Sequence, residues 1–155
     1  MINSELVVNS LKEKNLTISF AESATCGLLT SELVQYSNIS KIFNGSLVTY
    51  SNDFKSKVLN INEKTISDYG VISKEVVYEM AFNLRKIYPA DVIVSISGNA
   101  GPNNISNQET GIFFICYLIN EKAIVKKHVV SKNDRKKNLK QIVGIVYQEI
   151  LNLIK

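Results

Sequence analysis

The chain has 155 residues, of which 45% are hydrophobic and 21% are charged, and its formal net charge is +4. This length and composition are typical of one folded domain, so we expect a single domain over residues 1–155. No apolar run approaches the roughly 18–20 residues that a membrane-spanning helix needs. The first residues lack the basic and apolar regions of a signal peptide, and we therefore expect a cytoplasmic protein with no membrane partner.

Cysteine and histidine are scarce in this sequence. The two cysteines, Cys26 and Cys116, have no metal-ligand spacing, and we expect two reduced, mostly buried thiols. His128 is the single histidine, which argues against a structural zinc site. It also argues against a Ser-His-Asp triad unless His128 lies in the site. A lysine or tyrosine is therefore the expected base in any acyl-transfer chemistry.

Much of the positive charge lies between Lys122 and Lys140. A basic cluster of this kind binds nucleic acid or phosphate in some proteins, and in others it is a solvated helix start and strand end. A dedicated nucleic-acid binder usually has a larger excess of positive charge and exposed aromatic residues among its lysines. We therefore do not expect a nucleic-acid partner.

In chain order, the pattern of apolar residues predicts helices that alternate with strands. The expected helices begin near residues 4, 28, 52, 61, 74 and 133. The expected strands cover residues 16–20, 43–50, 91–97, 111–119 and 123–130. Ser73 is expected to cap the fifth helix and Pro89 to close it. Because helices separate most of the strands, the order predicts a three-layer α/β/α sandwich with a mixed, mostly parallel sheet that ends in an antiparallel hairpin.

Three loops of small and polar residues follow strands, at residues 21–27, 49–55 and 97–104. Ligands of open α/β sheets bind beyond the carboxyl ends of the strands, where such loops meet. Each loop also has a purely structural interpretation, as a helix cap, a surface segment or a turn. The first loop is the strongest candidate, because Ser23 and Thr25 precede a helix whose free N–H groups form an anion site.

Several motifs occur in a fixed order along the chain: AES-x-T-x-G at residues 21–27, VTYSN-x-x-K at 48–55, the pair Ser73 and Glu75, and SISG-x-AGP at 95–102. A glycine that opens the next strand follows them. Together they resemble the C-terminal domain of CinA, whose stand-alone versions are nicotinamide-nucleotide amidases (PncC). The resemblance extends over about residues 3–153 and implies the fold of that family.

This resemblance implies hydrolysis of the amide of nicotinamide mononucleotide, a phosphorylated nucleotide, to nicotinate mononucleotide and ammonia, with neither metal nor cofactor. It also implies a homodimer or larger homo-oligomer. By the same resemblance, Ser23 is the nucleophile, Lys55 its base or activator, and Tyr50 a residue that orients or relays the proton. The residues that it assigns to substrate binding are Glu22, Thr25, Gly27, Ser97, Gly98, Gly101 and Arg135.

Within that set, Thr25, the backbone around Gly27, and Ser97 would bind the substrate or the developing oxyanion. Glu22 would hold either Lys55 or the ribose. Arg135, in the sequence Asn133-Asp134-Arg135, would contact the phosphate. A solvated arginine in the first turn of a helix is an equally open interpretation of Arg135.

Some positions depart from the family pattern. Cys26 stands where the family has a glycine and Ala24 where it has a cysteine. Asn99 replaces an apolar residue, and Gln108 a lysine, with Glu109 beside it. These departures leave a second hypothesis open, in which the chain is a catalytically impaired or retuned family member that binds a nucleotide or a protein partner.

Overall fold

Helices and strands alternate along the chain as the apolar pattern predicts. The computed structural model describes residues 2–105, 108–131 and 134–155. Its elements are α1 (Ser4–Lys14), β1 (Ile18–Glu22), α2 (Leu28–Leu33), the 3-10 helix η1 (Ile39–Lys41), β2 (Phe43–Val48), α3 (Asn52–Leu59), α4 (Glu63–Tyr69), α5 (Lys74–Ile87), β3 (Val92–Gly98), β4 (Ile112–Ile119), β5 (Lys122–Val129) and α6 (Arg135–Ile154). Strand β2 is shorter than expected, because it ends at Val48. Asn133, near which we expected the last helix to begin, lies outside the described residues.

The strands form a mixed five-stranded sheet in the order β2-β1-β3-β4-β5. Strand β1 pairs in parallel with both β2 and β3, whereas β4 is antiparallel to β3 and to β5. The first three strands thus form the parallel part of the sheet, and β4 and β5 form the expected hairpin. The predicted mixed sheet is confirmed.

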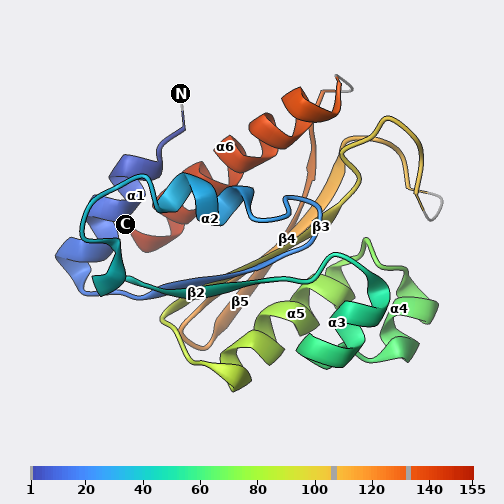
Figure 1. Ribbon diagram of the computed structural model, residues 1–155, viewed down its shortest axis with the longest axis horizontal. Helices are drawn as coiled ribbons and strands as arrows, with labels where there is room; N and C mark the ends of the chain where they lie inside the picture. Colours follow the sequence, from blue (N-terminus) through green and yellow to red (C-terminus); the bar gives the residue numbers. More distant parts are fainter. Residues whose placement is uncertain (1, 106–107, 132–133) are drawn as a thin grey trace.

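Helices cover both faces of this sheet (Figure 1). One core cluster joins residues of α1, α2 and α6 to side chains such as Phe20 and Ile96, and the other joins α5 and the end of α3 to Ala21 and Ile93. Because successive side chains of a strand point to opposite faces, β1 and β3 serve both clusters and are almost fully buried. The three-layer α/β/α architecture follows from this double burial.

Helix α5 shows how the sequence sets the boundaries of an element. Its buried residues recur every three or four positions and face the sheet: Val76, Val77, Met80, Ala81 and Leu84. Ser73 caps the helix as expected, since its Oγ accepts a hydrogen bond from the Val76 N–H at 3.3 Å. The helix ends at Ile87, two residues before Pro89.

The carboxyl ends of β2, β1 and β3 lie side by side, and backbone hydrogen bonds tie the first residues of their loops together. The Thr49 N–H donates to the Glu22 carbonyl at 2.8 Å, and the Ser23 N–H donates to the Ile96 carbonyl at 3.1 Å. These bonds continue the ladders of the sheet by one residue on each side of β1. The three candidate loops therefore converge at one edge of the sheet.

Three further observations concern membrane-spanning helices and the two cysteines. No helix among the described residues is long and apolar enough to cross a membrane. Both cysteines are free, and Cys116 is buried as expected. Cys26 is exposed, which corrects the expectation of a mostly buried thiol; Ser23, Ala24 and Thr25 before it in the same loop are buried.

Candidate active site

Ser23 and Lys55 are joined by a hydrogen bond at the carboxyl edge of the sheet. Lys55 Nζ donates to Ser23 Oγ at 2.9 Å and to the Tyr50 carbonyl at 2.9 Å. Helix α3 aims the lysine inward, and Ser51 caps that helix by accepting from the Phe54 N–H at 3.1 Å. Ser23 lies in the loop after β1 and Lys55 in helix α3, so the fold itself brings the pair together.

Lys55 is fully buried. Its two hydrogen-bond acceptors are uncharged oxygens, and no carboxylate forms an ion pair with it among residues 2–105, 108–131 and 134–155. Because burial disfavours the charged ammonium, the pKa of Lys55 falls from 10.5 to about 8. A lysine with this pKa is partly neutral near physiological pH, and a neutral amine is able to accept a proton from the serine hydroxyl.

The Ser23 loop is a tight turn in which two residues adopt left-handed backbone conformations. The Cys26 N–H donates to the Ser23 carbonyl at 3.0 Å, and Cys26 and Gly27 have φ angles of 46° and 94°. A side chain in this region costs about 1 kcal/mol relative to glycine. The cysteine is nevertheless accommodated, because its side chain is exposed and does not line the cavity beside Ser23.

Glu22 is the buried cap of helix α2. Its Oε2 accepts from Thr25 Oγ1 at 2.6 Å and from the N–H groups of Gly27 and Leu29 at 3.0 and 3.1 Å. Its Oε1 accepts from the Thr30 N–H at 2.9 Å and from Thr30 Oγ1 at 2.8 Å. These contacts occupy the free N–H groups of the helix that we expected to attract an anion. Glu22 thus shapes the loop, and neither it nor Thr25 lines the cavity.

Ser97 and Gly98 end strand β3 and line the cavity. Ser97 Oγ donates to the Val71 carbonyl at 2.9 Å. A Cβ atom on Gly98 would lie 2.1 Å from Cδ1 of Phe113 and 2.8 Å from the Ile112 carbonyl oxygen, so only glycine fits between β3 and β4 here. This close approach fixes where the loop leaves the sheet.

Asn99 then organises the loop that follows β3. Its side chain is fully buried. Its Oδ1 accepts from the Gly101 N–H at 2.8 Å, and its Nδ2 donates to the carbonyls of Asn103 and Gln108 at 2.8 and 3.2 Å. The departure at residue 99 therefore has a structural reason, because the asparagine satisfies backbone groups inside the loop. Gln108 Nε2 in turn donates to the Ile72 carbonyl at 3.4 Å.

Arg135 and Tyr50 meet at the mouth of the cavity. Arg135 Nη1 donates to the Gly101 carbonyl at 2.7 Å, and its Nη2 donates to the Tyr50 hydroxyl at 3.3 Å. Tyr50 thus contacts Lys55 through its carbonyl and Arg135 through its hydroxyl. The arginine lies in the first turn of α6, which Asp134 caps. Gly101 itself does not line the cavity.

These residues enclose a cavity of about 200 Å³. It is lined by Ser23, Ala24, Tyr50, Asn52, Lys55, Val71, Ile72, Ser97, Gly98, Ala100, Ile105 and Arg135. Among the described residues that line it, the charged side chains are the two cations, Lys55 and Arg135. The cavity therefore combines a serine hydroxyl, a buried amine, an apolar wall and a second cationic side chain at its mouth.

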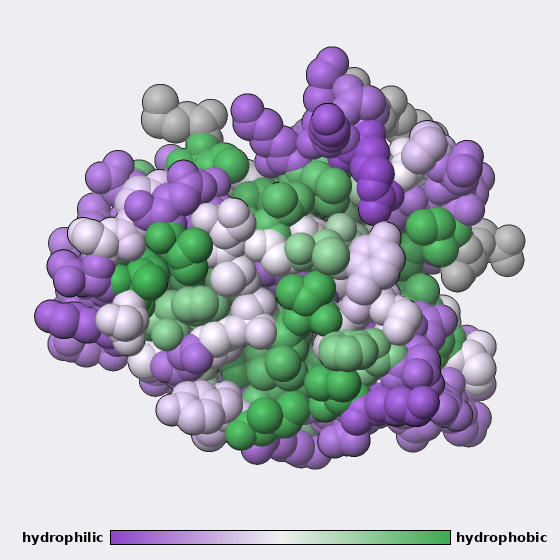
Figure 2. All heavy atoms as spheres, in the orientation of Figure 1, coloured by the Kyte–Doolittle hydropathy of each residue, from purple (hydrophilic) through white to green (hydrophobic). Residues whose placement is uncertain are grey.

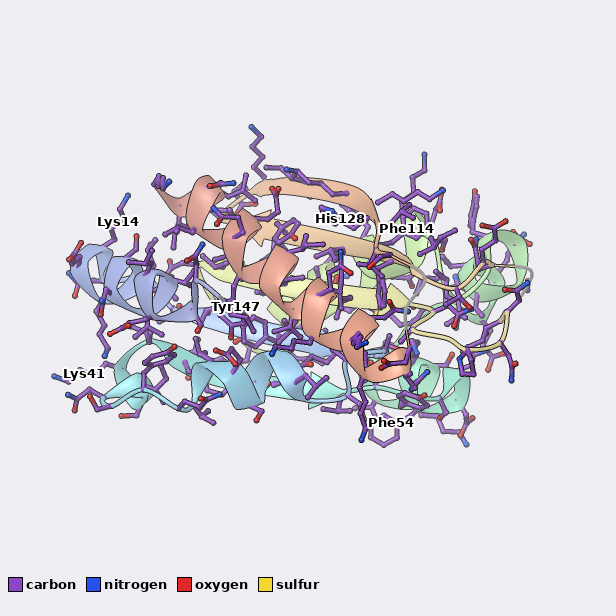
Figure 3. All side chains as sticks on the ribbon, turned by 90° about the horizontal axis from the view of Figure 1, so that it is seen from above. Lys14, Lys41, Phe54, Phe114, His128 and Tyr147 are labelled. Carbon is purple, nitrogen blue, oxygen red and sulfur yellow. The ribbon has the colours of Figure 1, made fainter. Side chains whose placement is uncertain are left out.

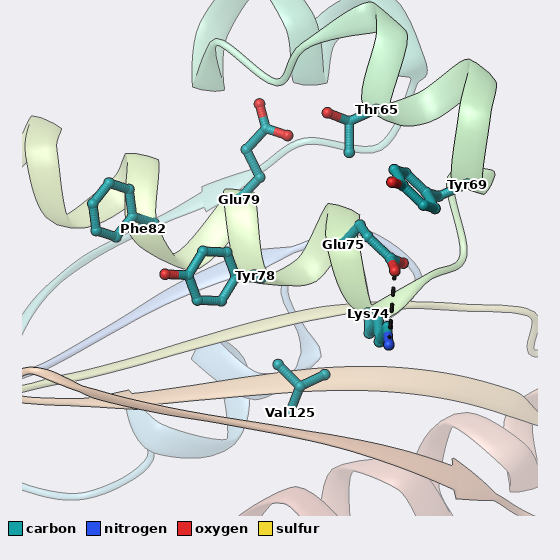
Figure 4. A pocket seen from close by; sticks show the side chains of 8 residues that line it. All are labelled: Thr65, Tyr69, Lys74, Glu75, Tyr78, Glu79, Phe82 and Val125. Atoms are coloured by element: carbon teal, nitrogen blue, oxygen red, sulfur yellow. Dashed lines mark ion pairs between the residues drawn. The ribbon is translucent and has the colours of Figure 1, made fainter.

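A larger cavity of about 580 Å³ lies elsewhere, between α4, α5 and β5 (Figure 4). It is lined by Thr65, Tyr69, Lys74, Glu75, Tyr78, Glu79, Phe82 and Val125. Its lysine is exposed and forms an ion pair with Glu75 at 3.9 Å. Since no buried base contacts a hydroxyl in this lining set, size alone does not make it the chemical centre.

The resemblance to known proteins extends beyond the motifs to the whole chain. Residues 2–154 match the model of the CinA C-terminal domain. The chain belongs to the CinA C-terminal domain family. This CinA domain is 40% identical over 146 residues to a CinA-like protein of Petrotoga mobilis, covering 94% of the chain and 36% of that protein. It therefore spans about a third of the length of that relative.

In two further comparisons, the match covers a larger share of the other protein. The domain is 38% identical over 120 residues to the Protein MG115 homolog of Mycoplasma pneumoniae, covering 77% of the chain and 76% of that protein. It also matches the crystal structure of a competence or damage-inducible protein from Enterobacter asburiae, with a TM-score of 0.94 and 25% identity over 100% of the chain and 99% of that structure. The CinA fold is thus shown along its whole length.

Sequence reasoning missed some residues of the site in this CinA domain. Val71 and Ile72 form part of the cavity wall, and Asn52 lies at the start of α3. The buried Asn138 of α6 donates from Nδ2 to the Ala100 carbonyl at 3.0 Å and so holds the third loop. The sequence does carry a signal for Asn138, because an asparagine on the buried face of an amphipathic helix stands where an apolar residue is the rule.

Proposed function

We propose that this CinA domain is a cytoplasmic serine–lysine amidohydrolase that converts nicotinamide mononucleotide to nicotinate mononucleotide and ammonia. The observation that carries the proposal is the 2.9 Å hydrogen bond between Lys55 Nζ and Ser23 Oγ in a buried setting. A hydroxyl beside an amine whose pKa is lowered to about 8 is the arrangement that serine–lysine catalysis needs. Family membership supports the same chemistry.

In the first half of the reaction, neutral Lys55 takes the proton of Ser23 while Oγ attacks the carbonyl carbon of the amide. The protonated lysine then gives a proton to the departing nitrogen, which leaves as ammonia, and an ester on Ser23 remains. In the second half, Lys55 takes a proton from water, and the hydroxide formed attacks the ester. The acid leaves, and the proton returns to Ser23 Oγ.

The walls of the cavity favour an aromatic amide that carries a phosphate. Val71, Ile72 and Ile105 supply apolar surface for a flat ring next to Ser23. Arg135 lies at the mouth, where its guanidinium is positioned to exchange the Gly101 carbonyl and the Tyr50 hydroxyl for phosphate oxygens. Under this proposal the amide lies at Ser23, the ring against the apolar side chains and the phosphate at Arg135.

The basic segment from residue 122 to 140 does not support a nucleic-acid function. Lys126 pairs with Glu149, and Lys137 Nζ lies 3.7 Å from Asp134. Lys127 Nζ lies 5.9 Å from the ring centroid of Phe114. Part of the positive charge in this segment is therefore engaged by neighbouring side chains.

Ammonia release from nicotinamide mononucleotide by wild type, Ser23→Ala and Lys55→Ala tests the proposal. We expect both variants to lose at least about 10²-fold in rate, because each removes one member of the proton-transfer pair. Equal rates in the three proteins would refute the catalytic assignment.

A second candidate function is ligand binding without turnover, which the departures from the family pattern at Cys26, Asn99 and Gln108 leave open. Thermal unfolding with and without nicotinamide mononucleotide distinguishes the two. Stabilisation by the nucleotide in a wild type that releases no ammonia would establish a binding protein.

A further inference from the structure

Three hydroxyl side chains follow one another across the carboxyl edge of the sheet. Glu22, the last residue of β1, pairs with Val48 of β2 and with Ile96 of β3. The residues that come after these three all bear hydroxyl groups: Ser23, Thr49 and Ser97. The ladder hydrogen bonds continue by one residue on each side of β1, and neighbouring strands are about 4.8 Å apart. Thr49 is therefore an immediate neighbour of Ser23.

Thr49 and Lys55 lie on the same face of the sheet. Successive residues of a strand point to opposite faces, and Leu47, two residues before Thr49, packs against the core cluster of α5. Leu59, one turn after Lys55 on α3, belongs to the same cluster. Helix α6 with its Tyr147 crosses the other face, which is the near one when the molecule is seen from above (Figure 3). The Thr49 side chain therefore points to the side from which Lys55 reaches the site.

The hydroxyl of Thr49 has no hydrogen-bond partner among the residues that the structure describes, although its side chain is fully buried. The surroundings are apolar, since hydrophobic residues gather across the middle of the face that shows β2, between the helices above and below it (Figure 2). The other two hydroxyls of the row are bonded, Ser23 to Lys55 and Ser97 to the Val71 carbonyl. Because an unpaired buried hydroxyl costs stability, the one on Thr49 needs an explanation.

Lys55 has the complementary deficit, because its charged form has more donors than acceptors. An ammonium carries three N–H groups. In the part of the chain that the structure describes, Lys55 Nζ donates to two acceptors, Ser23 Oγ and the Tyr50 carbonyl. In the proposed reaction Lys55 becomes charged when it takes the proton of Ser23, in a buried place that disfavours the charge. A third acceptor would stabilise the ammonium at this step.

The charged groups around Lys55 do not supply that acceptor. Arg135, the other cation of the cavity, is a donor itself, and the Tyr50 hydroxyl accepts from it. The Glu22 carboxylate is occupied by the hydroxyl and N–H groups at the start of α2. Asp53 of α3 is exposed and forms an ion pair of 3.0 Å with a lysine of its own helix. A buried acceptor without a partner is available on the neighbouring strand end, at Oγ1 of the threonine.

We propose that Thr49 is a positioning residue of the active site, whose Oγ1 accepts the third N–H of Lys55 when the lysine takes the proton of Ser23. This inference rests on the proposed serine–lysine function. The two atoms are unbonded among the described residues, so the bond is formed when the amine becomes charged. The proton moves from Ser23 Oγ to Lys55 Nζ, and Thr49 keeps its own proton. Since Thr49 does not line the cavity, it acts through Lys55 and not on the substrate.

The first test is the pKa of Lys55 in the free protein, measured by NMR titration of ¹³C-labelled lysine, with Lys55→Met identifying the signal. Thr49→Val replaces the hydroxyl by a methyl group of similar size. Ser46→Ala is the matched control, because Ser46 Oγ is also buried without a partner among the described residues but points to the opposite face of β2. We expect Thr49→Val to lower the pKa of Lys55 by about one unit, which is a tenfold weaker hold on the proton. Thr49→Ser should restore the pKa, and Ser46→Ala should not change it.

The second test is ammonia release above about pH 9, where Lys55 is mostly neutral in wild type and variant. We expect Thr49→Val to lower kcat about three- to tenfold with KM unchanged, because the proton is only partly transferred in the transition state. The same Lys55 pKa in wild type and Thr49→Val would overturn the proposal, and so would an equal fall in Ser46→Ala. An unchanged kcat in Thr49→Val beside an active wild type would also overturn it. A wild type that releases no ammonia would instead contradict the proposed function, and the pKa comparison would still decide the role of Thr49.

Discussion

Replacing Lys55 by arginine keeps a positive charge next to Ser23 and removes the possibility of a neutral base. With the pKa of Lys55 at about 8, about 9% of the amine is neutral at pH 7. At the ordinary pKa of 10.5 the neutral fraction would be about 0.03%, so burial raises the amount of active base about 300-fold. A guanidinium, whose pKa exceeds 12, supplies almost none.

We therefore expect kcat/KM of the wild type to rise about fivefold from pH 7 to pH 8 and to level off above about pH 9. Lys55→Arg is expected to have a kcat/KM about 10²–10⁴-fold lower than the wild type. Its kcat/KM should also no longer rise between pH 7 and pH 8. The assay is ammonia release from nicotinamide mononucleotide across this pH range. An arginine variant that keeps the rate and the pH profile of the wild type would refute the role of Lys55 as base.

The remaining predictions concern stability, measured by urea unfolding. Since the pKa of Lys55 is lower in the folded chain than in the unfolded chain, the unfolded chain binds more protons between about pH 8 and pH 10.5, and folding stability gains from rising pH in that window. Relative to Lys55→Met, the wild type should gain about 3 kcal/mol from pH 7 to pH 10.5, and a constant difference would contradict the burial argument. Glu22→Gln is expected to cost about 2–3 kcal/mol, because an amide places N–H groups against N–H donors of α2; a neutral effect would show that the cap is unimportant. Cys26→Gly should stabilise by about 0.5–1 kcal/mol by relieving a left-handed side chain, whereas destabilisation would mean that the turn is unstrained.

The fold was largely predictable from the sequence, because its elements obey simple patterns. Strand β3 is a continuous apolar run, and such a run indicates a strand covered on both faces. Helix α5 has an apolar stripe, a serine cap and a proline stop. The end of β2 was misplaced by two residues, because Thr49 and Tyr50 favour a strand while Ser51 already caps the next helix.

The candidate site was predictable only in part. The convergence of the three loops follows from parallel strands, but the partner of each side chain depends on distances that a pattern does not contain. Glu22 illustrates this, because its contacts with Thr25, Gly27 and Leu29 depend on the backbone conformation of one short loop. The direction of the Tyr50 hydroxyl depends in the same way on Arg135, which lies 85 residues along the chain.

The central claim is that Ser23 forms an ester with the acyl group of the substrate, and hydroxylamine trapping tests it most directly. If the ester forms, hydroxylamine attacks it in competition with water and gives a hydroxamate, while Ser23 regains its hydroxyl group. We predict hydroxamate from wild type with nicotinamide mononucleotide, and none from Ser23→Ala. Ammonia release without hydroxamate, or equal hydroxamate from Ser23→Ala, would contradict the account.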